Sequence, residues 1–388
     1  MRFEIINNKI KHILITLFIY SSILLPAFDK MSFKKVLFVL IMCYSFISIL
    51  KNKYISFKIL FRYIILISIL LLWTLPVSFT NDISHSLFII QSSLVLLVSF
   101  IFSDDPYYSY KSLLNASILL SIIVCIIAIT SVFFPVGSIL LKNIFFELDS
   151  GYIGIRQFGS INMMMIHFRT SPILIIAALQ YFIWSVEYKN KKYNKTNFLI
   201  IFTAILLSAS RGLILFTLLG LLLIMIIRIK KNKYYKICFL ISLFLIIFLI
   251  NKIIKNSNML SFDETSNNIK LNHILSFLNL VNDNIYRLFI GFGNGSSYYS
   301  SGFGNFTWQT EIVILDIIRY FGIPTAIVVL FVLFLPIRFF MDKTLTIIFS
   351  LYFINAIFTN PLIFNSTGML IIAIYWSMTA SNKYRNNL

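Results

Sequence analysis

Apolar residues run along this chain in long blocks that short polar stretches separate. A transmembrane helix needs about 20 mostly apolar residues to cross the hydrocarbon core of a bilayer. Twelve blocks approach that length, at residues 13–28, 36–50, 59–79, 84–103, 112–134, 172–188, 197–210, 212–228, 237–250, 311–336, 344–358 and 365–380. The pattern therefore predicts an all-α, polytopic integral membrane protein of about 12 transmembrane helices, with residues 1–388 forming a single membrane domain.

One of these blocks is interrupted by a short polar turn. The stretch from Asn197 to Ile227 contains the sequence Ser210-Arg211-Gly212 near its middle. A single helix of that length would measure about 46 Å, against a hydrocarbon core of about 30 Å. We therefore expect two spans here, joined by a tight turn.

Composition and charge support the membrane class and exclude several others. Hydrophobic residues make up 59% of the chain and charged residues 12%, against roughly a quarter in an ordinary soluble protein. The net charge of +19 is typical of nucleic-acid binding. So few polar residues cannot build a nucleic-acid surface, and we expect no nucleic-acid partner. The three cysteines and four histidines lack the spacing of a disulfide framework or a metal site, so no metal or other cofactor is expected.

The basic residues indicate how the chain is oriented in the membrane. Lysine and arginine favour the cytoplasmic side of short loops. Alternate loops at 51–58, 189–195 and 228–236 are strongly basic. Placing them inside also places both termini in the cytoplasm. The basic start before Ile13 lacks a small-x-small cleavage site, and we interpret the block after it as the first span.

Two long segments then fall on the outer side, at 135–171 and 251–310. The second contains apolar residues at helical spacing from Asn268 to Leu288. This spacing predicts an amphipathic helix lying on the outer membrane surface. The glycine-rich stretch from Gly291 to Gly304 is typical of a loop.

Charged residues in the block 311–336 need a physical reason, because charge at membrane depth costs several kcal/mol. Glu311 is expected to open this helix, where a carboxylate suits the positive end of the helix dipole. Asp316 and Arg319 are three residues apart and share a helix face, so they can pair. The group is either a helix-capping charge with a structural ion pair or a polar site at the rim of a cavity.

Several arginines also lie on the outer side, against the usual charge bias. Arg211 is surrounded by small residues that allow close approach of another group. It is either an interfacial arginine that reaches toward water or part of a binding site. The others are Arg156 and Arg169, with His167 between them, and Arg287. Because guanidinium groups match phosphate geometry, converging arginines would indicate a ligand that carries a phosphate or diphosphate.

These features resemble the polytopic O-antigen polymerase (Wzy-type) and O-antigen ligase superfamily. The resemblance rests on the number of spans, the two large outer loops and the Ser210-Arg211-Gly212 turn. It also rests on Gly291 and Gly293, the Arg-Tyr-Phe-Gly-Ile sequence from Arg319 to Ile323, and the Asn360-Pro361 turn. Ligases of this superfamily place a histidine where the second loop meets the next helix. Glu311 in that neighbourhood favours a polymerase.

The resemblance implies an inverting, metal-independent glycosyltransferase in the bacterial inner membrane. It would transfer a growing glycan from undecaprenyl diphosphate to a lipid-linked repeat unit on the outer face. Arg211, together with Arg156, Arg169 or Arg287, would bind the diphosphate, and Glu311 would act on the acceptor hydroxyl. Asp316 would maintain the site's geometry together with Arg319. The other expected substrate contacts are His167, Tyr298, Tyr299 and Trp308. A chain-length regulator would be a further partner.

Other functions remain open from the sequence. A lipid-linked oligosaccharide flippase, a small-solute transporter and an O-antigen ligase also need many spans. A flippase or transporter would show more even loops and an internal repeat, which this chain lacks. The glycan could be lipopolysaccharide O-antigen, capsule or exopolysaccharide.

Overall fold

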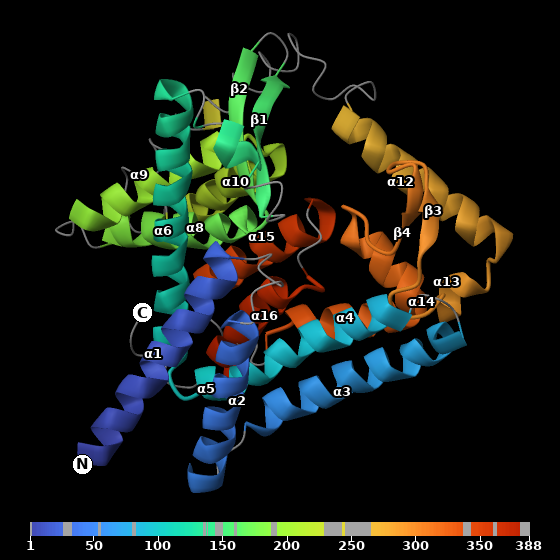
Figure 1. Ribbon diagram of the computed structural model, residues 1–388, viewed down its shortest axis with the longest axis horizontal. Coiled ribbons are helices and arrows are strands. Elements are labelled where there is room, and N and C mark those ends of the chain that lie inside the picture. The colour runs from blue at the N-terminus through green and yellow to red at the C-terminus, as the bar shows by residue number, and fades with distance from the viewer. Residues whose placement is uncertain are drawn as a thin grey trace. The chain divides into compact units, whose positions relative to one another are not determined.

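The computed structural model shows a largely helical protein with two small β-hairpins (Figure 1). The structure describes residues 2–25, 33–52, 56–79, 83–134, 137, 139–143, 150–158, 161–187, 192–228, 243–244, 265–336, 343–359 and 363–380. The expected span at 237–250 lies outside these residues, apart from Leu243 and Phe244, and so does the part of the second loop from 251 to 264.

Helices occupy the other expected spans. The first part of the chain forms α1 (Arg2–Leu24), α2 (Phe33–Asn52), α3 (Phe57–Thr74) with the 3-10 turn η2 (Leu75–Phe79), α4 (Ile83–Ser93) with η3 (Leu94–Val98) and α5 (Ser99–Phe102), and α6 (Pro106–Phe133). The middle forms η4 (Ser171–Ile173) with α8 (Leu174–Glu187), α9 (Lys192–Leu207) and α10 (Arg211–Arg228). The last part forms α12 (Thr265–Asp283), α13 (Arg287–Ile290), α14 (Val313–Phe334), α15 (Lys343–Thr359) and α16 (Ser366–Ala380).

Five of the described helical segments are long and apolar enough to cross a membrane. They are Phe57–Ser78, Ile83–Phe102, Pro106–Phe133, Arg211–Arg228 and Val313–Phe334, and four shorter apolar helices accompany them. The helical, apolar character of the protein is that of a membrane protein. The full set of 12 crossings stays a prediction. The predicted break near Arg211 is confirmed, because α9 ends at Leu207 and α10 begins at Arg211.

The chain divides into two compact units. The first contains residues 1–113, 269–342 and 356–388, and the second contains residues 114–268 and 343–355. A helix whose side chains are apolar all round is typical of a position buried within the protein or the membrane. In the first unit α16 is such a helix, buried from Thr367 to Thr379. In the second unit α8 is buried from Leu174 to Tyr181.

Part of the first long loop forms a β-hairpin, which the helix-only expectation did not include. Strands β1 (Gly151–Phe158) and β2 (Ile161–Phe168) pair antiparallel, with Gly151 opposite Phe168 and Arg156 opposite Met163. Ile153, Ile166 and Phe168 are buried on the second unit. A shorter hairpin in the second loop pairs β3 (Tyr298–Ser300) with β4 (Asn305–Thr307).

Helix α14 is broken in its middle, where the apolar block predicts one continuous span. Gly322 has φ 71° and ψ 163°, which are not helical values. The backbone N–H groups of Phe292 and Gly293 donate to the carbonyls of Arg319 and Tyr320, at 2.7 and 3.1 Å. Carbonyls freed by a helix break inside a membrane protein need such replacement partners. The break is therefore built jointly by α14 and a loop segment that precedes it.

That loop segment, Ile290–Ser296, also contacts the ends of α3 and α4. Trp73 of α3 donates its indole N–H to the Ile290 carbonyl at 2.7 Å. The backbone of Asn294 donates to the Trp73 carbonyl at 2.7 Å, and Ser86 of α4 donates to the Asn294 carbonyl. Glycine is needed at 291 because a Cβ there would lie 2.4 Å from the Tyr320 carbonyl oxygen. The segment thus joins three helices within the first unit.

Candidate functional site

The turn between α9 and α10 in the second unit gathers several of the predicted site residues. Ala209 adopts a positive φ of 46°, a conformation that costs free energy for a residue with a side chain. Such strain is concentrated at functional sites. The Ser208 hydroxyl accepts a hydrogen bond from the Ser210 backbone N–H at 3.3 Å, which helps to hold the turn. Arg211 then begins α10 directly after this turn.

Two of the predicted arginines meet at this turn. The Arg156 guanidinium, from strand β1, donates to the carbonyl of Ala209 at 3.3 Å. The Arg211 guanidinium donates to the side-chain oxygen of Asn267 at 3.3 Å. Both arginine side chains are half-buried. We refer to Arg156, Ala209 and Arg211 below as the arginine turn.

His167 is electrostatically linked to the arginine turn. Burial, with a smaller contribution from the charge of Arg156, lowers the pKa of His167 from 6.5 to about 4. Its Nδ1 atom is buried and has no hydrogen-bond partner among the described residues. His167 is therefore a neutral imidazole near pH 7, and the positive charge here comes from the arginines.

The remaining loop arginines lie elsewhere. Arg169 is exposed just after β2, where its backbone N–H donates to the Ser150 carbonyl at 3.0 Å. Arg287 belongs to the first unit, where its guanidinium donates to the Gly291 carbonyl at 3.2 Å and lies over the rings of Tyr286 and Phe292.

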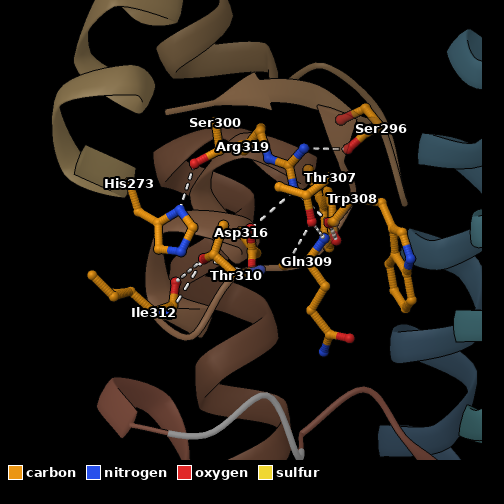
Figure 2. A network of polar contacts seen from close by, with 11 residues as sticks. His273, Ser296, Ser300, Thr307, Trp308, Gln309, Thr310, Ile312, Asp316 and Arg319 are labelled. Carbon is orange, nitrogen blue, oxygen red and sulfur yellow. Dashed lines mark hydrogen bonds and ion pairs between the residues drawn. The ribbon is translucent and has the colours of Figure 1, made fainter. Parts of the chain in front are cut away.

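A second group of predicted residues forms a buried polar network at the start of α14 (Figure 2). The Asp316 carboxylate accepts hydrogen bonds from the backbone N–H and the hydroxyl of Thr310, at 2.7 and 3.1 Å. It also accepts one from Arg319 at 2.9 Å. Asp316 and Arg319 therefore form the i, i+3 ion pair that the sequence predicts.

Arg319 is enclosed by this network. Its guanidinium donates to the carbonyls of Ser296 and Trp308 and lies over the Tyr298 and Tyr320 rings, 4.5 and 4.8 Å from their centroids. The side chain is 1% exposed. In this arrangement Arg319 connects the backbone before β3 with the backbone after β4.

Glu311 lies at the edge of the same network, but not inside the helix. Helix α14 begins at Val313, so the expectation that Glu311 opens this helix is wrong by two residues. The reason is local: the Thr310 hydroxyl and the Asp316 carboxylate fix residues 310–312 in a turn. The Glu311 carboxylate lies 3.7 Å from Lys270 of α12, and both side chains are partly exposed.

The aromatic residues expected to contact sugar differ in accessibility. Tyr298 is buried against Arg319, and this burial raises the pKa of its hydroxyl. Tyr299 is 55% exposed and meets Phe306 edge to face. Trp308 is half-buried and stacks on His85 with ring centroids 5.1 Å apart. Tyr299 and Trp308 are thus the members of this set that retain accessible surface.

His273 on α12 is a residue that the sequence did not single out. It is fully buried, its Nδ1 lies 2.5 Å from the Ser300 hydroxyl oxygen, and its Nε2 has no partner among the described residues. Burial, and then the charge of Lys270, lower its pKa. A signal was present: His273, Phe277 and Val281 recur every four residues, which places the histidine on the buried face of α12.

No group of three or more metal-binding side chains occurs within the described ranges. The expectation of a metal-free reaction stays a prediction.

Fold and site together define a class of protein, namely a helical membrane protein with a cationic turn and a carboxylate-bearing second loop. The chain is 29% identical over 215 residues to an O-antigen polymerase of Shigella flexneri. The match covers 52% of this chain and 51% of that protein, so the chain spans about half the length of the relative. No protein-family model and no solved structure matches the chain.

Proposed function

We propose that the protein is a polysaccharide polymerase of the bacterial inner membrane, with both termini in the cytoplasm. It transfers a growing glycan from undecaprenyl diphosphate to a lipid-linked repeat unit on the outer face. The observation that carries the proposal is the hydrogen bond from Arg156 to the strained turn at Ala209, which Arg211 directly follows. The likeness to an O-antigen polymerase supports the same class of reaction.

The reaction is a substitution at the anomeric carbon of the donor glycan. An acceptor sugar hydroxyl forms the new C–O bond from the face opposite the leaving group, so the configuration inverts. The bond to the lipid diphosphate breaks, and its electron pair leaves with the diphosphate. The arginine turn stabilises the negative charge that develops on that group, since preorganised charged donors stabilise a transition state most.

Glu311 acts at the acceptor in this proposal. It orients the attacking hydroxyl and accepts its proton, for which a carboxylate accessible to substrate is required. Its partial exposure and its ion pair with Lys270 fit this role. Asp316 and Arg319 position the loop backbone next to Glu311, and Tyr299 and Trp308 offer faces for sugar rings.

Deleting the gene and analysing the cell-surface glycan tests this proposal. A polymerase deletion leaves single repeat units on the final acceptor, and a plasmid copy of the gene restores the polymer. Loss of all repeat units would instead identify a flippase, and polymer retained on the carrier lipid would identify a ligase.

A purified sample tests the chemistry directly. The protein in liposomes should extend a lipid-linked repeat unit in the presence of EDTA. Activity that EDTA abolishes and Mg²⁺ restores would contradict the metal-independent mechanism.

A further inference from the structure

Helix α12 has apolar side chains on two of its faces. The sequence predicts an amphipathic helix with a single apolar face. On the inner face, Phe277 and Val281 pack with Tyr298 in a buried cluster. This face is covered by protein. Any residues of α12 that contact a membrane therefore lie on another face of the helix than Phe277 and Val281.

The outer face of α12 continues into α13 as an uncovered apolar surface. Its seven large side chains are between 38 and 69% exposed: Ile274, Leu275, Leu278, Ile285, Tyr286, Phe289 and Ile290. We call these residues the outer apolar surface. The charged residues of α12 are Lys270, which pairs with Glu311, and Asp283 at the C-terminal end. In α13, Arg287 is half-buried, and its guanidinium lies over the ring of Tyr286, a member of this surface.

The position of α13 connects this surface to the membrane. Trp73, near the end of α3, donates to the carbonyl of Ile290, the last residue of α13. Tryptophan is enriched where a transmembrane helix meets the headgroup region. Leu72 in the last turn of α3 and Leu75 at the start of η2 are also exposed, at 57 and 61%. Because α3 is a candidate span, we expect these leucines to contact lipid, and α13 is joined to the same helix end.

We propose that the outer apolar surface is inserted in the outer leaflet of the bilayer, so that α12 and α13 are an interfacial anchor of the second loop. Seven exposed apolar side chains on α12, α13 and the turn between them are unfavourable in water, and burying them in lipid removes that cost. The lipid surface is favoured over a protein partner because the surface continues the lipid-facing side of α3. The proposal does not depend on the catalytic activity.

Fluorescence quenching at single sites tests this proposal. The cysteines at 43, 125 and 238 are replaced by serine, and Phe289→Cys and Leu278→Cys are each labelled with an environment-sensitive fluorophore in nanodiscs. Asn305→Cys is the matched control, because Asn305 is exposed in β4 of the same unit. Thermal unfolding of each labelled protein verifies that the fold is intact.

The expected result is strong quenching at 289 and 278 by nitroxide-labelled lipids, several-fold above that at 305. Iodide in solution should show the reverse order. Quenching at 289 and 278 by iodide alone would overturn the proposal, because the surface would then face water. Protection from both quenchers would also overturn it, because a protein partner or a second copy of the chain would then cover the surface.

Discussion

The carboxylate of Asp316 lies 2.9 Å from the guanidinium of Arg319, and each side chain is only 1% exposed. The attraction within a buried ion pair offsets its desolvation cost only when good geometry and further hydrogen bonds accompany it. Thr310 supplies hydrogen bonds to Asp316, and the carbonyls of Ser296 and Trp308 accept them from Arg319, whose Nε has no partner among the described residues. The pair therefore connects the start of α14 to both ends of the β3–β4 hairpin.

Replacing Arg319 by glutamine should destabilise the protein strongly. Breaking a buried pair by removing one partner costs about 3–5 kcal/mol, because the other charge is left uncompensated. Thermal unfolding in nanodiscs measures this loss. Lys270→Gln is the control, since its pair with Glu311 is partly exposed and contributes below about 1 kcal/mol. Equal melting temperatures for Arg319→Gln and the unchanged protein would show that the pair is not structural.

Arg211 and Arg228 stand at opposite ends of α10 and provide a matched comparison. Arg211→Ala should lower the rate of polymerisation by about 10²–10³-fold, the usual effect of losing a donor that stabilises transition-state charge. Arg228→Ala removes only the ion pair with Glu187 and should leave polymer length unchanged. Glycan electrophoresis at equal membrane levels of protein provides the readout. Full-length polymer made by Arg211→Ala would refute the diphosphate role.

Glu311→Gln keeps the size of the side chain but removes its capacity to accept a proton. If Glu311 is the acceptor base, the rate should fall by about 10²–10⁴-fold, while binding of the lipid-linked substrate should change little. The rate of repeat-unit transfer and the substrate affinity are measured on the same liposome sample. Glu187→Gln serves as a control carboxylate in the other unit. An unchanged rate for Glu311→Gln would remove Glu311 from the reaction.

The hairpin β1–β2 should lose stability in acid because of His167. The pKa of this imidazole is about 4 in the folded protein and 6.5 in its ordinary state. Between these values the unfolded chain binds a proton that the folded chain does not, so stability falls as pH falls. The stabilisation is complete above about pH 6.5 and is lost progressively toward about pH 4.

Unfolding measured at several pH values tests this expectation. His167→Asn cannot titrate and should therefore show a smaller loss of melting temperature between about pH 7 and about pH 5. An identical pH dependence in both proteins would mean that His167 does not account for the effect.

Local patterns predicted the parts of the structure that depend on neighbours in sequence. The helix positions follow from apolar blocks, and the ion pair of Asp316 and Arg319 follows from i, i+3 spacing. The turn before Arg211 follows from the length of the block around it. Each of these features needs only residues that are close along the chain.

Features that depend on distant residues were not predictable in this way. Sequence suggested four outer arginines, and the structure brings Arg156 and Arg211 to one turn but leaves Arg287 in the other unit. The break at Gly322 needs N–H donors from Phe292 and Gly293, which the apolar block does not reveal. The hairpin β1–β2 escaped notice because apolar residues do not alternate with polar ones along its strands. Ile153 and Ile155 lie on the same side of β1, yet the first is buried and the second is exposed.

The segment Ile290–Ser296 also determines the order in which the protein can be assembled. Its bonds to Trp73 and Ser86 join residues that are 217 and 208 positions apart in the chain. During synthesis, α3 and α4 leave the ribosome and enter the membrane long before this segment exists. The ends of these helices at Trp73 and Ser86 lack their partners until the second loop has been synthesised. A nascent chain that stops before residue 290 therefore lacks the segment that joins these helices.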